Sequence, residues 1–485
     1  MSPNDVQGDV LPMSPERFDL ATVKRGLAGA DGGRLQPAGL RDVLIGRDAL
    51  ASLPEVVAAV LAARGTSGRV ALVSDARPKR CACGELRTAS EDLLSGRFSL
   101  RTVVAGDESA VVHADEATLA AVSDGCRGAA CIVAVGSGTI ADIGKAVAAE
   151  LGAGYVVVQT ANSVNGYADD RSVLLVSGVK RTTQTTWADA LVIDTDVLVG
   201  APSRMNISGF ADLIATFTAP ADWYLANVLQ MDHFYSPTVV ALARDRGAGL
   251  LEAAPRVPDA DPGALEYVAA TLTLSGLSMG VAATTAPGSG MEHTVGHLID
   301  MAAMSAGRDS DLHGIQVGVS SICSAVLWQH VLEALADGGL RRVRVATPDE
   351  ARARVVAAFS ALDATGAMAE ECWSDYERKL ARWAAAQAQV GALADDWAVH
   401  ERALRGLLAE PRELVEALRR AGAPLRFSEL EPAVDRDLVR WALASCHLMR
   451  DRFSVADLAW SLGLWDQDHV DDLITETEAI IAGTA

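Results

Sequence analysis

The feature that most constrains the fold is a regular alternation between short runs rich in Val and Ile and longer helical stretches, which begins near Gly39. Runs of this kind, with apolar residues on both faces, are typical of a parallel sheet that helices cover on both sides. The strands predicted for this sheet cover residues 43–45, 70–73, 100–104, 130–135, 155–158 and 190–194. A helix is predicted over residues 54–63, and residues 172–175 and 180–184 predict a hairpin. The pattern predicts a Rossmann-like α/β fold.

Beyond Pro202 the strand signals stop, and helical periodicity continues to the end of the chain. The clearest helical segments cover residues 209–228, 264–277, 314–336 and 348–362. Residues 1–38 are rich in Pro, Gly and Asp and lack apolar periodicity, which predicts a flexible tail. The sequence therefore predicts an α/β Rossmann-like domain over residues 39–202, followed by an all-α domain over residues 203–485. A cleft between the two is the expected place for an active site.

The charge of the chain excludes some classes of partner. With 42 Lys and Arg against 63 Asp and Glu, the net charge is −21 over 485 residues. Such a field repels nucleic-acid backbones and anionic membranes, which leaves a small-molecule substrate. If that substrate is anionic, the chain must supply a local positive site.

The cysteines and the N-terminus predict a cytoplasmic protein. The seven cysteines form no C-x-x-C pair, and the first residues lack a signal-peptide pattern. Cys81 and Cys83 are two thiols without a second pair nearby, which is more typical of a loop than of a metal site. Residues 267–291 are uncharged, but Pro287 and several polar residues interrupt them, so they predict a buried helix that runs into a loop rather than a membrane span.

A glycine turn between a predicted strand and a predicted helix offers a site for a dinucleotide. The strand ends in Gly136-Ser137-Gly138, and the helix begins near Thr139. Backbone N–H groups in such a turn can approach a pyrophosphate, although glycines also serve simply to make a tight turn. Asp75 ends an earlier strand, where a carboxylate can bind the adenine ribose and disfavour a 2′-phosphate. An ordinary turn residue is the alternative explanation for Asp75.

Three histidines and one acid suggest a metal site in the helical half. His293 and His297 lie four residues apart, one helical turn, and His313 follows shortly after. Asp212 begins an otherwise apolar helix, where a buried carboxylate needs hydrogen bonds or a cation. One Asp and two His with an open position is the arrangement of a catalytic metal. A helix-start carboxylate and ordinary histidines are the alternative explanations.

Five motifs occur here in an order that resembles the sn-glycerol-1-phosphate dehydrogenase family. This family lies within the iron-containing alcohol dehydrogenase and dehydroquinate synthase-like superfamily. The motifs are GSGTIADIGK, QTANSVNGY, APSRMNISGFADL, SGMEHTVGH and LHGIQVGV. The resemblance covers roughly residues 39–470, and an ordered set of motifs is far more specific than any one of them. It implies a dehydroquinate synthase-like fold.

The resemblance assigns roles to particular residues. The implied metal ligands are Asp212, His293 and His313. The implied cradle for the cofactor pyrophosphate and nicotinamide is Gly136, Ser137, Gly138, Thr139 and Asp142. Thr160 and Ser163 would lie along the cofactor, and His297 would sit beside the metal as a proton relay or a supporting group. Lys145 matches the lysine of the glycine loop, although a helical lysine is more often solvated. Many relatives carry an Asp that contacts the substrate hydroxyl at the position of Asn165, which keeps an acceptor but loses the charge.

The implied activity is the metal-dependent, NAD(H)-linked reduction of a small ketone or aldehyde that carries a phosphate. Glycerone phosphate, reduced to sn-glycerol 1-phosphate, is the default substrate. Zinc is the expected metal, with nickel and iron as alternatives, and Asp75 favours NAD(H) over NADP(H). Two other functions stay open: a dehydroquinate synthase-like carbon–oxygen lyase that uses NAD and a metal, and a scaffold that binds nucleotide without catalysis. The sequence leaves the oligomeric state open, a homodimer included.

Overall fold

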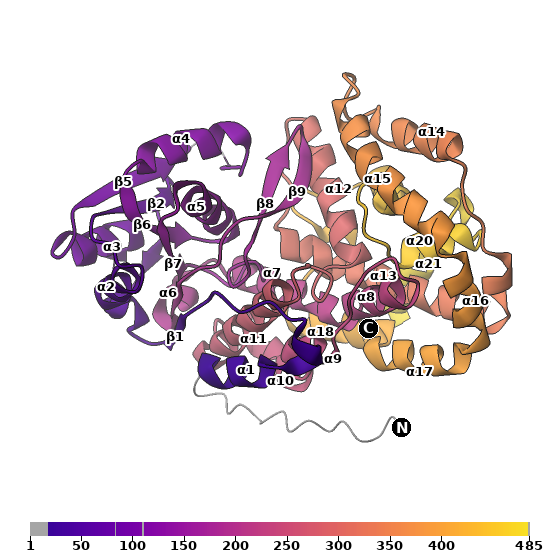
Figure 1. Cartoon of the computed structure of the whole chain (residues 1–485), viewed down its shortest axis with the longest axis horizontal. Coiled ribbons are helices and arrows are strands. Elements are labelled where there is room, and N and C mark those ends of the chain that lie inside the picture. Colours follow the sequence, from indigo (N-terminus) through magenta and orange to yellow (C-terminus); the bar gives the residue numbers. More distant parts are fainter. Residues whose placement is uncertain (1–17, 83, 109–110, 484–485) are drawn as a thin grey trace.

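The computed structural model describes residues 18–82, 84–108 and 111–483, and it shows an α/β half beside a helical half (Figure 1). The α/β half contains a parallel six-stranded sheet with the order β1-β10-β7-β6-β2-β5. Its strands are β1 (Asp42–Gly46), β2 (Arg69–Asp75), β5 (Leu100–Ala105), β6 (Ala129–Gly136), β7 (Gly154–Gln159) and β10 (Ala190–Asp194). All six coincide with the predicted runs, so the predicted parallel sheet is confirmed.

Both faces of this sheet are buried because successive side chains of each strand point to opposite sides. Leu72 and Val133 pack in one apolar cluster with Val57, and their neighbours Ala71 and Ile132 belong to the cluster on the other face. The helices of this half are α2 (Leu53–Ala63), α3 (Leu86–Ser95), α4 (Glu116–Cys126) and α5 (Gly138–Leu151). Burial on both faces explains why these strands read as continuous apolar runs rather than as alternating patterns.

The predicted hairpin is present and connects the two halves. Strands β8 (Arg171–Val176) and β9 (Val179–Gln184) pair antiparallel in a sheet of their own. Lys180 of β9 is ion-paired with Asp300 of the helical half. Arg181 lies 2.9 Å from a carboxylate oxygen of Glu371, also in the helical half. The hairpin therefore reaches from the sheet to the helices, as Figure 1 shows.

After Asp194 the described residues form helices and loops but no further strand. The longer helices nearest to the sheet are α7 (Ser203–Leu213), α8 (Ala219–Val228), α11 (Pro262–Val281), α12 (Met291–Ser305) and α13 (His313–Ala336). The predicted segment 209–228 is two helices, because a short 3-10 turn over Ile214–Phe217 follows α7 and Pro220 starts a new helix. Helix α6 (Thr195–Gly200) follows β10 directly and packs against it and against α11. The remaining helices of the helical half are α9 (Pro237–Arg244), α10 (Gly247–Ala253), α14 (Pro348–Phe359), α15 (Ala367–Ala385), α16 (Gln387–Asp395), α17 (Trp397–Leu407), α18 (Pro411–Arg420), α19 (Arg436–Ser445), α20 (Val455–Ser461) and α21 (Gln467–Gly483).

The prediction of a flexible tail over residues 1–38 is wrong for the part that the structure describes. Helix α1 (Leu20–Leu27) has Asp19 as its N-cap, and Leu20, Val23 and Leu27 are buried in the main core. These three residues are spaced as one helix face, a signal that the surrounding Pro, Gly and Asp obscured. Residues 1–17 lie outside the described residues. The division of the chain at residue 202 stays a prediction, because one apolar cluster extends through both halves.

Two helices are long and apolar enough to cross a membrane by length and composition, α11 and α13. In each, more than four fifths of the most apolar window is buried inside the protein, 83% and 89% respectively. This agrees with the expectation of a buried helix before Pro287. Cys81 is disulfide-bonded, which the sequence analysis did not foresee. The other described cysteines, all of them buried and free, are Cys126, Cys131, Cys323, Cys372 and Cys446.

Candidate functional site

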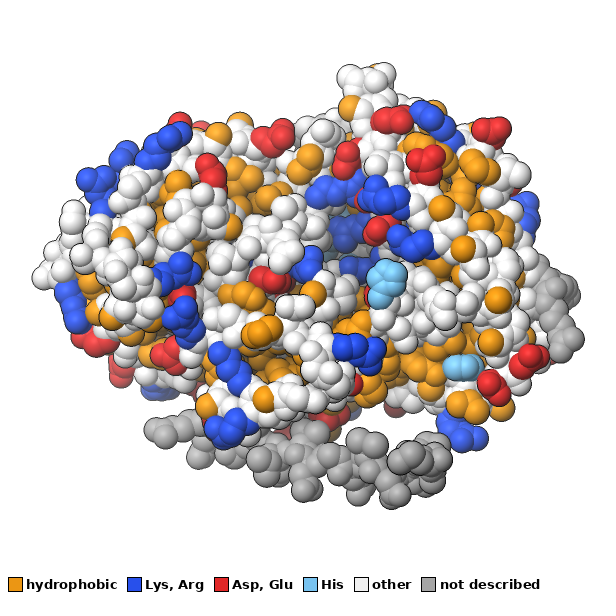
Figure 2. All heavy atoms as spheres, viewed as in Figure 1, with side chains coloured by type: hydrophobic (Ala, Val, Ile, Leu, Met, Phe, Trp, Pro, Cys, Tyr) orange, Lys and Arg blue, Asp and Glu red, His pale blue; other side chains and the backbone are white. Residues whose placement is uncertain are grey.

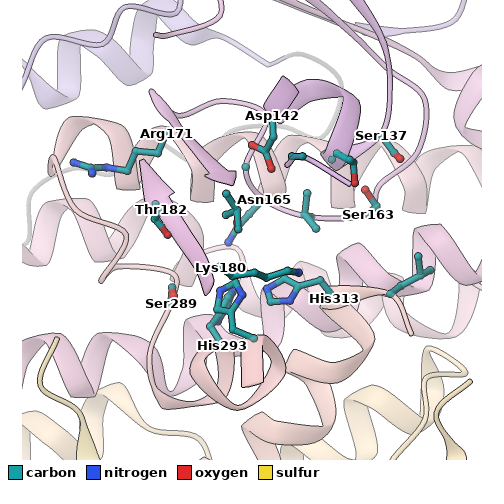
Figure 3. Close-up of a pocket in the computed structure, with 18 of the residues that line it drawn as sticks. Ser137, Asp142, Ser163, Asn165, Arg171, Lys180, Thr182, Ser289, His293 and His313 are labelled. Carbon is teal, nitrogen blue, oxygen red and sulfur yellow. The ribbon is translucent and has the colours of Figure 1, made fainter. Parts of the chain in front are cut away.

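A cavity of about 240 Å³ lies between the sheet and the helices, and most of the predicted site residues line it (Figure 3). Ser137 and Asp142 face it from the sheet side, and His293 and His313 face it from the helical side. Residues 163–166 and the hairpin complete its wall. The predicted site residues that line the cavity are Ser137, Gly138, Thr139, Asp142, Ser163, Asn165, His293, His297 and His313. The cleft predicted between the two halves is therefore a real cavity.

The three predicted metal ligands converge from three helices. Asp212 lies near the end of α7, His293 in the first turn of α12, and His313 at the first position of α13. One potential ligand atom of each residue lies within 4.8 Å of the other two. Asp212 Oδ1 is 3.3 Å from His293 Nε2. The distances fit one cation held by a carboxylate and two imidazoles.

The hydrogen bonding of Asp212 supports this fit. Its Oδ2 atom accepts a 2.9 Å hydrogen bond from the backbone N–H of Asn165. Its Oδ1 atom is buried and accepts no hydrogen bond from the described residues. A buried carboxylate oxygen without a donor is costly unless a cation compensates it. The residues present therefore suit a divalent metal with nitrogen and oxygen ligands.

A buried carboxylate stands behind His293. Glu292 Oε1 lies 3.0 Å from His293 Nδ1, so Glu292 holds this ring nitrogen while Nε2 faces Asp212. Burial disfavours the imidazolium, but the nearby carboxylates of Asp212 and Glu292 outweigh it and raise the pKa of His293 to about 9. A metal bound at Nε2 would take the place of that proton. This carboxylate–histidine arrangement is the one that fixes the tautomer of metal-binding histidines.

His297 lies one helical turn beyond His293 and stacks on His313, with ring centroids 4.7 Å apart. Burial, and after it the positive charge of Arg450, holds the pKa of His297 well below its usual value, which keeps the ring neutral. His297, Asp300 and His313 also form a second group whose ligand atoms lie close together. Asp300 in that group is already ion-paired with Lys180, and so the first group is the better cation site. Burial would raise the pKa of Asp300, but Lys180 and His313 lower it below its usual range.

The glycine turn brings the start of α5 to the cavity. Strand β6 ends at Gly136, and α5 begins at Gly138, where a Cβ atom would lie 2.9 Å from a methyl group of Val164. Packing therefore requires glycine here, while the N-terminal N–H groups of the helix face the cavity side where an anion can bind. Asp142, one turn into α5, is partly buried. Burial raises the pKa of Asp142 to about 7, although Lys145 opposes the shift.

Three of the predicted cofactor residues do not line the cavity: Asp75, Gly136 and Thr160. Thr160 is adjacent to it, since its N–H donates to the carbonyl of Gly136 over 3.2 Å. Asp75 ends β2, and its Oδ1 atom accepts hydrogen bonds from the Arg77 backbone and from Lys79, at 2.9 and 2.8 Å. Lys79 partly neutralises this carboxylate. The ribose contact of Asp75 stays a prediction.

Asn165 lies where the sheet side meets the metal ligands. Besides the backbone bond to Asp212, its Nδ2 atom donates to Ser275 Oγ over 3.2 Å. Ser163 Oγ lies 2.8 Å from the hydroxyl of Tyr167. The QTANSVNGY segment thus forms the floor between the glycine turn and Asp212, a contact that its sequence does not reveal.

Two lysines at this site were not understood from the sequence. Lys145 is fully buried rather than solvated, and its ammonium group lies 2.5 Å from Asp169 and donates to two backbone carbonyls. Lys180 lines the cavity from the hairpin and pairs with Asp300. The match of Lys145 to the glycine-loop motif was one signal for its importance. Nothing in the sequence marked Lys180, because only the fold brings the hairpin to α12.

Comparison with known proteins finds one family and several relatives. Residues 44–202 match the family described as iron-containing alcohol dehydrogenase. The chain is 30% identical to a glycerol-1-phosphate dehydrogenase of Methanospirillum hungatei, over 61% of this chain and 78% of that protein. It is 28% identical to the enzyme of the same name from Bacillus licheniformis, over 64% of this chain and 63% of the relative. A third glycerol-1-phosphate dehydrogenase, from Haloquadratum walsbyi, is 35% identical over 55% of its own length. The chain therefore spans less than two thirds of the Bacillus licheniformis and Haloquadratum walsbyi relatives.

The fold has close parallels among solved structures. A glycerol dehydrogenase from Schizosaccharomyces pombe superimposes with a TM-score of 0.58, at 15% identity, over 92% of this chain and 90% of that one. A probable glycerol dehydrogenase from Sinorhizobium meliloti gives a TM-score of 0.57 at 16% identity, over 92% and 98%. At this identity the likeness concerns the fold alone. It confirms the predicted class, a Rossmann-like α/β domain followed by an all-α domain.

Proposed function

Because this chain belongs to the glycerol-1-phosphate dehydrogenase family, we propose that it is a metal-dependent oxidoreductase that transfers hydride between a nicotinamide dinucleotide and a small carbonyl compound. The observation that carries the proposal is the convergence of Asp212 with His293 and His313, since these two histidines line one side of a cavity whose other side is the glycine turn. The two reactants of a hydride transfer must meet in one enclosed space. A cavity with these two walls would let the nicotinamide ring of a bound cofactor and a small carbonyl compound lie side by side.

Different residues of the chain would bind the metal and the cofactor. Asp212, His293 and His313 would hold the metal, which when bound acts as a Lewis acid toward the carbonyl or alcohol oxygen of the substrate. The turn from Gly136 to Thr139 would bind the pyrophosphate through backbone N–H groups and the dipole of α5. Asn165 holds Asp212 in place through its backbone N–H. Closure around the cavity would exclude water and align the reacting carbons.

His297 is suited to act as a proton relay. Its ring is buried and neutral at pH 7, because its pKa lies well below the usual value. Its Nδ1 atom has no hydrogen-bond partner among the described residues. A neutral imidazole with one unengaged nitrogen can accept a proton from an alcohol and return it to an alkoxide. His297 would thereby carry the proton that accompanies hydride transfer.

The finer assignments follow from the family and from Asp75. The default substrate is glycerone phosphate, reduced to sn-glycerol 1-phosphate, the expected metal is zinc with nickel and iron as alternatives, and the expected location is the cytoplasm. NAD(H) is favoured over NADP(H), since a carboxylate at the end of β2 disfavours a 2′-phosphate. The lyase alternative is less well supported, because its family pattern expects a Glu among the metal ligands where this chain has Asp212.

The test is an NADH-oxidation screen of the metal-reconstituted protein against glycerone phosphate and related aldehydes and ketones. We expect turnover that requires added metal and that is highest with a small phosphorylated ketone. Loss of activity after chelation and its return with Zn²⁺, Ni²⁺ or Fe²⁺ identifies the metal. Absence of NADH oxidation with every carbonyl compound, together with tight NAD binding, would contradict the proposal and favour the lyase or the scaffold.

A further inference from the structure

Two partly buried arginines lie close to the cavity, although neither is among the residues that line it. Arg450 and Arg452 belong to the loop before α20, and no carboxylate of the described residues forms an ion pair with either. Arg450 makes one long hydrogen bond, 3.5 Å, to the carbonyl of Lys180. Arg452 donates only to neutral oxygens, those of Ser289 and Thr285.

The two lysines that are fully buried among the described residues are each paired with a carboxylate. Lys145 has Asp169 as its partner, and Lys379 lies 2.7 Å from Asp457. Arg181, a neighbour of Arg450, is paired with Glu371 and with Asp375. Burying a guanidinium without a partner is costly, and burying two like charges together costs more. Burial and the charges of Arg452 and Arg181 lower the pKa of Arg450 to about 9, although Asp375 and Asp451 oppose the shift.

The two arginines stand directly behind the cavity wall. Ser289 and Thr285, which accept hydrogen bonds from Arg452, both line the cavity. Arg450 influences the titration of His297, which also lines it. Figure 3 shows Ser289 on the same side of the cavity as His293 and Lys180, and away from Ser137 at the glycine turn. The two guanidinium groups therefore lie nearer to the metal end of the cavity than to the dinucleotide turn.

The surface agrees with this local charge. Although the chain carries a net charge of −21, Lys and Arg side chains gather around a hollow between the two halves (Figure 2). A hollow lined by one sign of charge concentrates ligands of the opposite sign. Arginine is also suited to a planar, doubly hydrogen-bonded contact with an oxyanion, and Arg450 has most of its five N–H donors available for one.

We propose that Arg450 and Arg452 form the subsite that recognises the phosphoryl group of the substrate, and that they thereby determine specificity for phosphorylated carbonyl compounds. The inference rests on the proposed function in taking the oxyanion to be part of the substrate. Ser289 and Thr285 would offer hydroxyl groups to the same phosphoryl oxygens. The metal would hold the carbonyl end of the substrate and the arginines its phosphate end, which fixes the direction in which the molecule lies.

The first experiment measures selectivity in the metal-loaded enzyme. The ratio of kcat/KM for glycerone phosphate to kcat/KM for unphosphorylated glycerone is compared between wild type, Arg450→Gln and Arg452→Gln. We expect each substitution to lower this ratio by about tenfold to a hundredfold, the range of a charge-assisted hydrogen bond. The matched control is Arg354→Gln, which removes a partly buried guanidinium that contacts His447, away from the cavity. An unchanged ratio in both test variants would overturn the inference.

The second experiment needs no turnover. Inorganic phosphate is titrated into the NAD-loaded protein by calorimetry, with acetate as a parallel titrant to distinguish a phosphoryl site from a carboxylate site. We expect phosphate to bind to wild type and to Arg354→Gln, and to bind at least tenfold more weakly to Arg450→Gln and Arg452→Gln. Equal phosphate affinity in all four proteins, or a preference for acetate, would refute the subsite. Phosphate binding that depends on the arginines, without any carbonyl reduction, would leave the subsite standing and refute the proposed function instead.

Discussion

The two walls of the cavity differ in the chemical groups that form them. The sheet side offers backbone N–H groups and small side chains, such as Ser137 and Thr139, that follow one another in the sequence. The helical side offers ionisable side chains, Asp212, His293 and His313, from three separate helices. The comparison shows that a binding site formed by backbone groups can be encoded by one short sequence motif. A site made from side chains needs the packing of distant helices to exist at all.

The two sides also treat buried acids differently. On the sheet side Asp142 is partly buried and has no ion pair among the described residues; desolvation raises its pKa to about 7, although Lys145 opposes the shift. On the helical side Asp300 is buried, but Lys180 and His313 hold its pKa below the usual range. Asp142 is thus held close to its neutral form, whereas Asp300 keeps its charge because Lys180 balances it.

The sharpest test of the comparison removes a ligand from the helical side. Replacing His293 or His313 by Ala should abolish both bound metal and turnover, because two remaining ligands cannot hold a catalytic metal tightly. Elemental analysis of the purified variants measures the metal, and NADH oxidation measures the rate. His297→Ala is the matched control on the same helix and should keep the metal while losing about 10- to 100-fold in kcat. Stoichiometric metal in His293→Ala or His313→Ala would exclude that residue from the ligand set.

The corresponding change on the sheet side is Gly138→Ala. Its Cβ atom would lie 2.9 Å from Val164, so the turn must shift, and backbone N–H groups would move away from the pyrophosphate. We expect the KM for NADH to rise about tenfold or more, with the bound metal unchanged. Gly96→Ala is the control, since nothing lies within 4 Å of its added Cβ. Loss of metal in Gly138→Ala would show that the two sides are not independent.

Asn165 lies between the two sides, and its substitution tests where they meet. Asn165→Asp should place a second carboxylate beside Asp212, which repels a phosphorylated substrate and attracts the metal. The net contribution of a hydrogen bond to a charged group is about 1.5–3 kcal/mol, against about 1 kcal/mol for a bond between neutral groups. We therefore expect the substitution to change substrate specificity about tenfold. The readout is the ratio of kcat/KM values for glycerone phosphate and the best other carbonyl compound. A constant ratio would make Asn165 a structural residue only.

A smaller effect on cofactor preference is expected from Asp75, which ends β2 outside the cavity. Wild type should prefer NADH to NADPH, and Asp75→Asn should narrow that preference by less than about tenfold, because Lys79 already offsets the carboxylate. Steady-state constants with both cofactors give the answer. A clear NADPH preference of the wild type would mean that Asp75 does not contact the ribose.

The smallest expected effect concerns stability and pH. The pKa of Asp142 is about 7 in the folded protein against 3.8 for a free side chain, so the folded state binds its proton more tightly. The contribution of this protonated carboxyl group to the free energy of unfolding is therefore fully present near pH 4 and below, and it is lost as the pH rises through 7. Asp142→Asn should remove this loss and raise Tm at pH 8.5 by about 5 °C, with a smaller gain at pH 5.5. Equal gains at both pH values would show that Asp142 does not titrate in this range.

Much of the α/β half was readable from the sequence. Six apolar runs predicted the strands, of which the central ones are buried on both faces, and Gly136-Ser137-Gly138 located the turn, because buried strands and tight turns leave local signatures. The spacing of His293 and His297 predicted one helix face. In contrast, the small helix α1 was missed, since its three apolar residues are a weak signal beside so many Pro and Gly residues.

The sequence by itself determined which residues are chemically able to act: the acid Asp212, the histidines and the glycine turn. Only the tertiary structure decided which of them meet. It placed Glu292 against His293, Lys180 against Asp300, and Arg450 and Arg452 next to Lys180 and Ser289 at the cavity. Charges of this kind carry no periodicity, so their meaning depends on the burial and partners that long-range packing supplies. The physical reason is that the cost of a buried charge is fixed by its neighbours in space, not by its neighbours in the chain.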